Sequence, residues 1–445
     1  MPLDVSVKLS SGPREGPAPA RGLRGTLARR EPFVSFVVSV GAVNASFLLG
    51  NALAFRFVDP TSMGVWHTLL LVNTYLTVVR LGLVNGMGRE LPFALGQGDL
   101  ARARRIAATA LAFNTACCVL VALVFGGGLI VWWSAGPAWR LALPAMAVFG
   151  ALNLYLAFLQ ATFRSDRDFA RLTRINWTQA ATGLLLPPMV YAFGFAGFCL
   201  HAALQAIVVT AFAHAWRPFV VPPRFEGKLA GELVATGFPL FAGSYALVVA
   251  TGFDRVILLQ RGTVEMVGLY APALAVLAAM AIVPGAVATW VFPRMSYALG
   301  QGQAPGALRW TALGAGLLSM LAGLPVAVLG WALAPEVIGR FFPQYAGSVE
   351  AVRFSLLSGL LLSLSPATQV LGSLKAWPSL VVTIGVTLVA RWAFPWVLSD
   401  VYPPLEGVAR GNVWASAVTS ALSLALVWRA TGVHAANFPA SEGGA

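Results

Sequence analysis

The pentapeptide ALGQG occurs twice in this chain, as Ala94–Gly98 and as Ala298–Gly302, and the two copies are 204 residues apart. A chance match of five residues would not extend beyond itself. Here three further pairs of landmarks keep the same offset and order: Gly64 and Gly268, Trp66 and Tyr270, and Arg105 and Arg309. We therefore interpret the chain as an internal duplication of one unit.

The segments around these landmarks are uniformly apolar. Of the 445 residues, 58% are hydrophobic and 11% charged, whereas soluble domains have about 25% charged residues. Apolar runs of about 20 residues, long enough to cross a hydrocarbon core of ~30 Å, recur along the whole length. Strands of a membrane barrel would instead alternate over about ten residues. The sequence therefore predicts an all-α polytopic membrane protein.

About twelve spans can be counted, six in each copy. The first six are 32–55, 66–88, 106–131, 141–163, 175–193 and 197–216, and the second six are 238–259, 267–291, 310–331, 351–371, 379–398 and 408–428. Because six is even, both copies enter the membrane from the same side, which is typical of parallel repeats. We expect two six-helix lobes related by a pseudo-two-fold axis along the membrane normal, with substrate between them.

This plan divides the chain into five parts. They are a disordered basic tail (1–31), the N-terminal lobe (32–216), an inter-lobe linker (217–237), the C-terminal lobe (238–428) and a second tail (429–445). Most Lys and Arg residues fall in the tails, the linker and alternate loops, so the positive-inside rule places both termini and the linker in the cytoplasm. The first tail lacks the apolar core of a signal peptide.

The net charge of +13 is explained by topology and by attraction to anionic lipid, and it requires no nucleic acid. The three cysteines, Cys117, Cys118 and Cys199, fall inside spans and are expected to pack as small hydrophobic residues. Nothing in their spacing indicates a metal site.

Span two carries the clearest polar stripe. At about 100° per residue, its polar side chains fall on one arc of the helix: Arg80, Asn73, Thr77, Thr74, His67 and Asn85. An ionisable group inside a span costs about 2.5–3.5 kcal/mol on insertion scales and is by default a functional hypothesis. Arg80 is too deep to reach the interface easily and has no acid within a helical turn, so it is the strongest candidate.

Other spans also carry polar residues. Asp254 and Arg255 stand together in span seven, Arg391 lies in span eleven, and Asn44 and Asn51 share a face of span one. Two of the arginines can be explained without a functional role. Arg255 is equally well a structural partner of Asp254, and Arg391 is equally well a side chain that extends to the membrane interface.

Two blocks of sequence, the second in two parts, carry a resemblance to a known family. RLGLVNGMGRELPFALGQGDLARARR (80–105), together with GFDRVILLQRGTVEMVGLYAPAL (252–274) and FPRMSYALGQG (292–302), resembles bacterial polysaccharide flippases of the Wzx type. These belong to the multidrug/oligosaccharidyl-lipid/polysaccharide exporter (MOP) superfamily. The resemblance implies alternating-access transfer of undecaprenyl-pyrophosphate-linked oligosaccharide from the cytoplasmic to the periplasmic leaflet of the inner membrane, for surface polysaccharide biosynthesis. Besides that lipid and the surrounding membrane, it implies a glycan polymerase and a chain-length regulator as partners.

Such a headgroup needs two kinds of ligand. Guanidinium groups match phosphate oxygens in pairs, and amides and hydroxyls suit sugar hydroxyls. The expected substrate-binding residues are Arg80, Arg255, Arg391, Asn73, Thr77, Asn44 and Asn51. Asp254 is the candidate for proton or sodium coupling, and no cofactor or metal site is expected.

Two other functions stay open. A cation-coupled multidrug antiporter of the same superfamily would bind cationic substrates and should have acids in its cavity, whereas Asp254 is the clear intramembrane acid. A membrane glycan polymerase or glycosyltransferase would need catalytic groups on a sizeable outer loop, and the outer loops are short. We therefore expect a transporter rather than an enzyme.

Overall fold

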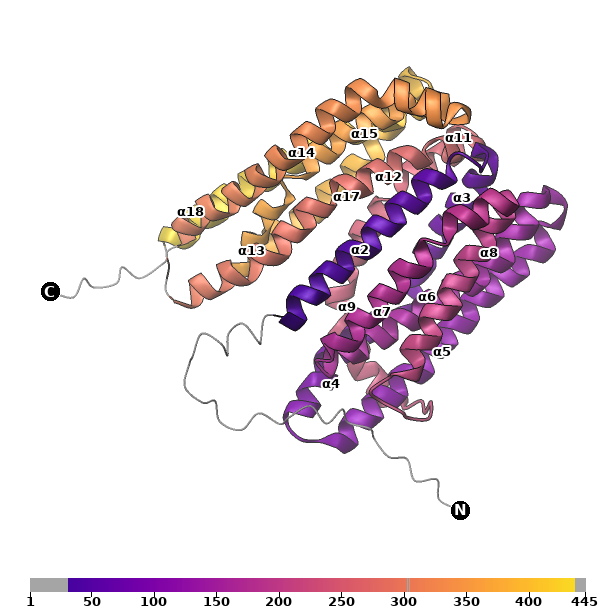
Figure 1. Ribbon diagram of the computed structural model, residues 1–445. Helices are drawn as coiled ribbons and strands as arrows, with labels where there is room; N and C mark the ends of the chain where they lie inside the picture. The colour runs from indigo at the N-terminus through magenta and orange to yellow at the C-terminus, as the bar shows by residue number, and fades with distance from the viewer. Residues whose placement is uncertain (1–30, 302, 304, 437–445) are drawn as a thin grey trace, which may run out of the picture. The chain divides into compact units, whose positions relative to one another are not determined.

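The computed structural model describes residues 31–301, 303 and 305–436 (Figure 1). Regular structure in this part of the chain is helical, with no strand, which confirms the all-α prediction. Eleven helical segments in it are long and apolar enough to cross a membrane, and the 15-residue α7 (Phe169–Gly183) is consistent with a twelfth span. The expected tails fall largely on residues 1–30 and 437–445, outside the described residues.

The chain forms two compact units. The first holds Leu69–Tyr245 and the residues up to Val58, and the second holds Asp59–Thr68 and the chain from Ala246 onward. The chain therefore passes between the units three times: between Val58 and Asp59, inside α3 (Pro60–Leu76) and inside α9 (Gly227–Ala250).

The first unit is a helical bundle in which α5 and α6 run side by side and α2 packs on α7 and α8. Its buried core includes Met87, Leu91, Ile106, Phe163 and Ile175. Besides α7 and parts of α3 and α9, its elements are α2 (Glu31–Ala54), η1 (Thr77–Arg80), α4 (Leu83–Gly96), α5 (Leu100–Val131), η2 (Trp133–Ala135), α6 (Pro137–Ser165) and α8 (Leu186–Ala215).

The second unit is built around the pair α17 and α18, against which α15 packs. One of its clusters of buried side chains joins Val291, Met295, Val370, Leu371 and Val427. Besides the start of α3 and the end of α9, its elements are α10 (Phe253–Arg261), α11 (Val264–Leu269), α12 (Ala271–Met280), α13 (Ile282–Gly300), α14 (Pro305–Phe341), η3 (Pro343–Ser348), α15 (Val349–Leu362), η4 (Ser365–Thr368), α16 (Gln369–Ser373), α17 (Trp377–Val401) and α18 (Pro404–Ala436).

The fifth and sixth spans begin and end elsewhere than the sequence predicts. Helix α7 ends at Gly183 and α8 starts at Leu186, because Pro187 can stand in the first turn of a helix but lacks the N–H that a continuing helix needs. The break expected between residues 193 and 197 is instead a kink inside α8 at Gly194, whose φ is 55°.

Span two is interrupted where a continuous helix is predicted. Helix α3 gives way to the 3-10 turn η1, and Leu81 and Gly82 adopt positive φ of 47° and 76° before α4 begins. The cause is non-local: a Cβ on Gly82 would lie 2.8 Å from the backbone of Gly237 on α9. Only glycine permits so close an approach of two backbones together with a left-handed conformation.

Span seven is divided in the same way. Helix α9 ends at Ala250, Thr251 and Gly252 form a turn, and α10 starts at Phe253. Ser244 and Arg255, which fall within the single predicted span 238–259, therefore belong to different helices.

Candidate functional site

A cavity of about 560 Å³ lies in the first unit, between η1, α4 and α6. Three arginines line it: Arg80 from η1, Arg89 from α4 and Arg164 from the last turn of α6. The remaining lining residues are Val84, Asn85, Gly88, Pro92, Ala157, Ala161 and Ser165, so no carboxylate is present among the described residues of the wall. We call this the arginine cavity.

The guanidinium groups of these three arginines make no hydrogen bond or ion pair with another described residue, and Nε of Arg80 is buried without a partner. Arg80 also lies close enough to Arg164 for their charges to repel. Several other arginines of the described chain do pair with acids: Arg102 with Glu90, Arg105 with Glu226, Arg171 with Asp168, Arg353 with Glu350 and Arg410 with Glu406.

Arg80 is half-buried, whereas Arg89 and Arg164 are exposed. Three positive charges around one cavity, with no carboxylate beside them among the described residues, make it a candidate site for an anion. Guanidinium groups present their donors as a rigid fork, so a cluster of them suits the oxygens of a phosphate or pyrophosphate. The side chains of Asn85 and Ser165 add amide and hydroxyl groups to the same wall.

Arg80 stands where span two is interrupted. It is the last residue of η1, and it lines the cavity together with residues of α4 and α6. Asn85 and Arg89 are one turn apart on α4 and therefore share a face. The polar stripe predicted for span two is thus only partly correct, since Asn85 belongs to a second helix.

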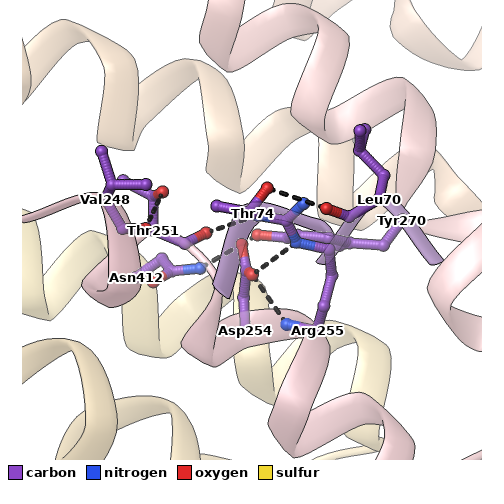
Figure 2. A network of polar contacts seen from close by, with 8 residues as sticks. All are labelled: Leu70, Thr74, Val248, Thr251, Asp254, Arg255, Tyr270 and Asn412. Atoms are coloured by element: carbon purple, nitrogen blue, oxygen red, sulfur yellow. Dashed lines mark hydrogen bonds and ion pairs between the residues drawn. The ribbon is translucent and has the colours of Figure 1, made fainter. Parts of the chain in front are cut away.

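Asp254 and Arg255 lie in the second unit and form a hydrogen-bonded ion pair (Figure 2). The backbone N–H of Arg255 donates to Oδ1 of Asp254 at 2.7 Å, its Nε donates to the same oxygen at 3.3 Å, and its Nη2 donates to the carbonyl oxygen of Thr251 at 2.8 Å. Both side chains are buried, with exposed fractions of 4% and 9%. In this arrangement Arg255 is a partner of Asp254, with its charge already compensated.

A second buried polar pair stands beside Asp254. Asn412 on α18 donates from Nδ2 to the hydroxyl of Tyr270 at 2.9 Å (Figure 2), and Tyr270 interacts electrostatically with Asp254. The sequence identified Tyr270 as a repeat landmark but gave no sign of Asn412, which is a lone amide near the start of the last span.

The other predicted ligands do not reach the arginine cavity. Asn73 is buried and its Oδ1 has no hydrogen-bond partner among the described residues. Thr77 donates to the carbonyl oxygen of Thr74 at 2.7 Å. In α2, Asn44 and Asn51 each donate to a carbonyl four residues earlier, at 3.0 and 2.8 Å. Arg391 lines a separate cavity in the second unit.

Arg89 and Arg164 were missed as ligands at the sequence level. Both stand at the ends of inner loops, where the positive-inside rule already explains an arginine. The signal that sets Arg89 apart is its spacing of four residues from Asn85 on the predicted polar stripe.

No family model and no curated protein matches the sequence, whereas solved structures match the fold. A multidrug resistance MATE family transporter of the MOP superfamily in its inward-facing conformation superposes with a TM-score of 0.75 at 16% identity, over 91% of this chain and 100% of that chain. Its outward-facing conformation gives a TM-score of 0.65 at 16% identity, over 91% and 96%.

Another match is a MOP superfamily transporter from Pyrococcus furiosus, for which a reverse polarity of the binding pocket suggests a different function. It gives a TM-score of 0.61 at 18% identity, over 91% of this chain and 96% of that chain. The chain therefore has the fold of MOP superfamily transporters.

Proposed function

We propose that the chain is a flippase of the MOP superfamily that moves undecaprenyl-pyrophosphate-linked oligosaccharides across the bacterial inner membrane by alternating access. The observation that carries this proposal is the arginine cavity, in which Arg80, Arg89 and Arg164 line one wall without a carboxylate. Such a wall is complementary to a pyrophosphate and repels an organic cation.

The place of the cavity along the chain fits the direction of transport. Arg89 and Arg164 border the loops 89–105 and 164–174, which the positive-inside rule assigns to the cytoplasm. A lipid-linked oligosaccharide assembled at the cytoplasmic leaflet would meet the arginines first. Its product would then pass to a glycan polymerase and a chain-length regulator, the partners that this function implies.

The second candidate is a cation-coupled multidrug antiporter. It is favoured by the solved multidrug transporters of this fold and by a buried acid, Asp254, that is a candidate for proton or sodium coupling. The charge of the arginine cavity argues against a cationic drug as the cargo of this chain.

A series of ligands that differ only in charge tests the proposal. The purified protein in detergent is titrated with farnesyl pyrophosphate, farnesyl monophosphate and farnesol, and the midpoint of thermal unfolding is followed. A ligand that binds the native state raises the midpoint, and at 100 times its Kd it adds about 2.7 kcal/mol. We expect the largest rise with pyrophosphate, less with monophosphate and none with farnesol.

The variants Arg80→Ala and Arg164→Ala should lose most of this rise. Arg174→Ala, which removes an exposed arginine outside the cavity, is the matched control and should keep it. Equal shifts with farnesol, or a larger shift with a lipophilic cation such as ethidium, would favour the antiporter instead.

A further inference from the structure

The second unit contains a cavity of about 250 Å³ whose wall is rich in hydroxyl groups. We call it the hydroxyl pocket. Its polar lining comes from four places: the turn after α9, η4, α17 and α18. Its polar lining includes Thr251, Thr383, Thr387, Arg391, Thr419 and Ser420.

Most of these hydroxyl protons are already in use. Thr251 donates to the carbonyl oxygen of Val248 at 2.7 Å, and Ser420 donates to that of Leu361 at 3.0 Å. On α17, Thr383 and Thr387 each donate to the carbonyl four residues earlier, at 2.9 and 2.7 Å. A hydroxyl has one proton and two lone pairs, so these oxygens remain available as acceptors. Such a wall is suited to a ligand that donates hydrogen bonds in several directions.

Two groups in the pocket lack a partner. The Oγ1 of Thr419 is buried and makes no hydrogen bond among the described residues. Arg391 is half-buried and makes neither a hydrogen bond nor an ion pair with another described residue. Its guanidinium group excludes a metal cation from the acceptor oxygens and presents a fork that matches a carboxylate.

The spacing of polar residues along α17 indicates how long a ligand this face can contact. Thr383, Thr387 and Arg391 are successive positions four residues apart, so they share one face, and at 1.5 Å per residue they extend over about 12 Å. A carboxylate held at Arg391 leaves room for one sugar ring beside the two threonines. The leucines of the wall, among them Leu247 and Leu424, offer an apolar surface to the C–H face of such a ring.

We propose that the hydroxyl pocket binds one sugar ring bearing a carboxylate, a uronic acid residue of the transported glycan. The proposal rests on the proposed function for the source of the ring, because the binding chemistry itself requires only an acidic sugar. A pyrophosphate is the poorer ligand here, since the pocket holds one arginine where the arginine cavity holds three.

The test uses the full chain in detergent and saturation-transfer NMR with methyl β-D-glucuronide. Methyl β-D-glucoside and acetate serve as probes of the ring and the charge alone. We expect the glucuronide to bind and both partial probes to bind at least roughly tenfold more weakly. Arg391→Ala should remove the preference for glucuronide over glucoside, and Thr383→Val with Thr387→Val should weaken both sugars. Arg340→Ala, which changes an exposed arginine of the same unit, should change nothing.

Equal binding of glucuronide, acetate and inorganic phosphate would overturn the proposal, as would glucuronide binding that survives Arg391→Ala. Uptake of labelled glucuronide into proteoliposomes would overturn the glycan as the source of the ring, because a subsite for a bound glycan predicts binding without uptake. Farnesyl pyrophosphate binding is measured on the same variants. If it persists while the glucuronide fails to bind, this inference fails alone and the proposed function stands.

Discussion

Gly64 on α3 and Gly268 on α11 pack backbone to backbone inside the second unit. The space for a Cβ on Gly64 is taken by the carbonyl oxygen of Val264, and the space for a Cβ on Gly268 is taken by that of Pro60. Each carbonyl belongs to the residue four positions before the opposite glycine, and both pairs keep the 204-residue offset of the repeat. A reciprocal contact of this kind is what an isologous, two-fold arrangement produces, so it supports the internal duplication.

Gly268→Ala should therefore destabilise the protein. A methyl group at this crossing must push two helix backbones apart, and overpacking of a tight contact costs about 1–3 kcal/mol. Thermal unfolding in detergent measures the change. Gly314→Ala is the matched control, because no atom lies within 4 Å of a Cβ built there and alanine is the better helix former. Equal midpoints for the two variants would show that the crossing tolerates a side chain.

The start of α5 is bound to the segment before α9 by an ion pair between Arg105 and Glu226. Nε and Nη2 of Arg105 both donate to the carboxylate, at 3.1 and 2.6 Å. The hydrogen bond and charge of Arg105 hold the pKa of Glu226 below its usual range, so the pair contributes stability above the ordinary glutamate pKa of about 4.3 and loses it as the pH falls through the lowered folded-state pKa.

Glu226→Gln should then lower the unfolding midpoint at pH 7, and the difference from the parent protein should shrink as the pH falls below about 4. Unfolding midpoints between pH 7 and pH 3.5 provide the measurement. Glu336→Gln, which alters an exposed acid, is the control. A difference that does not change with pH would mean that the carboxylate charge is irrelevant to the contact.

Asp254→Asn separates the two roles of this acid. If Asp254 serves to neutralise Arg255, as their hydrogen bonds indicate, the variant leaves a buried arginine uncompensated and lowers stability, by up to about 3–5 kcal/mol. The protein that remains should transport with unchanged dependence on proton and sodium gradients. Normal protein levels combined with loss of gradient dependence would instead assign Asp254 to ion coupling. Transport of the substrate in proteoliposomes, measured under imposed proton and sodium gradients, distinguishes the two outcomes.

The fold was accessible from the sequence because it depends on the length and composition of the spans, which are local quantities. The interruptions of spans two and seven could not be predicted from the sequence. The turn at Leu81 and Gly82 forms where Gly237 of another helix approaches, and no periodicity within span two contains that information. Proline and glycine near Gly183 do mark a helix boundary, but the uniform apolarity of the region hid it.

The candidate site, like the fold, could be predicted from the sequence only in part. Arg80 was identified because an arginine deep in a span has no local explanation. Arg89 and Arg164 do have a local explanation, because positive charge at inner loops sets topology. Only the packing of α4 against α6 brings them to the same cavity as Arg80. For Arg255 the sequence left two roles open, as a substrate ligand or as a structural partner of Asp254, and its contact with Asp254 favours the structural role.

The proposed function assigns to Arg80 the recognition of the pyrophosphate of a lipid-linked glycan. Surface glycan is measured in cells whose sole copy of the protein carries Arg80→Ala or Arg80→Lys, together with the amount of protein in the membrane. A hydrogen bond to a charged group contributes about 1.5–3 kcal/mol, so Arg80→Ala should lower glycan export roughly ten- to hundredfold at normal protein level. Arg80→Lys should restore it in part, because lysine keeps the charge without the fork. Full glycan export by Arg80→Ala at normal protein level would contradict this role of Arg80.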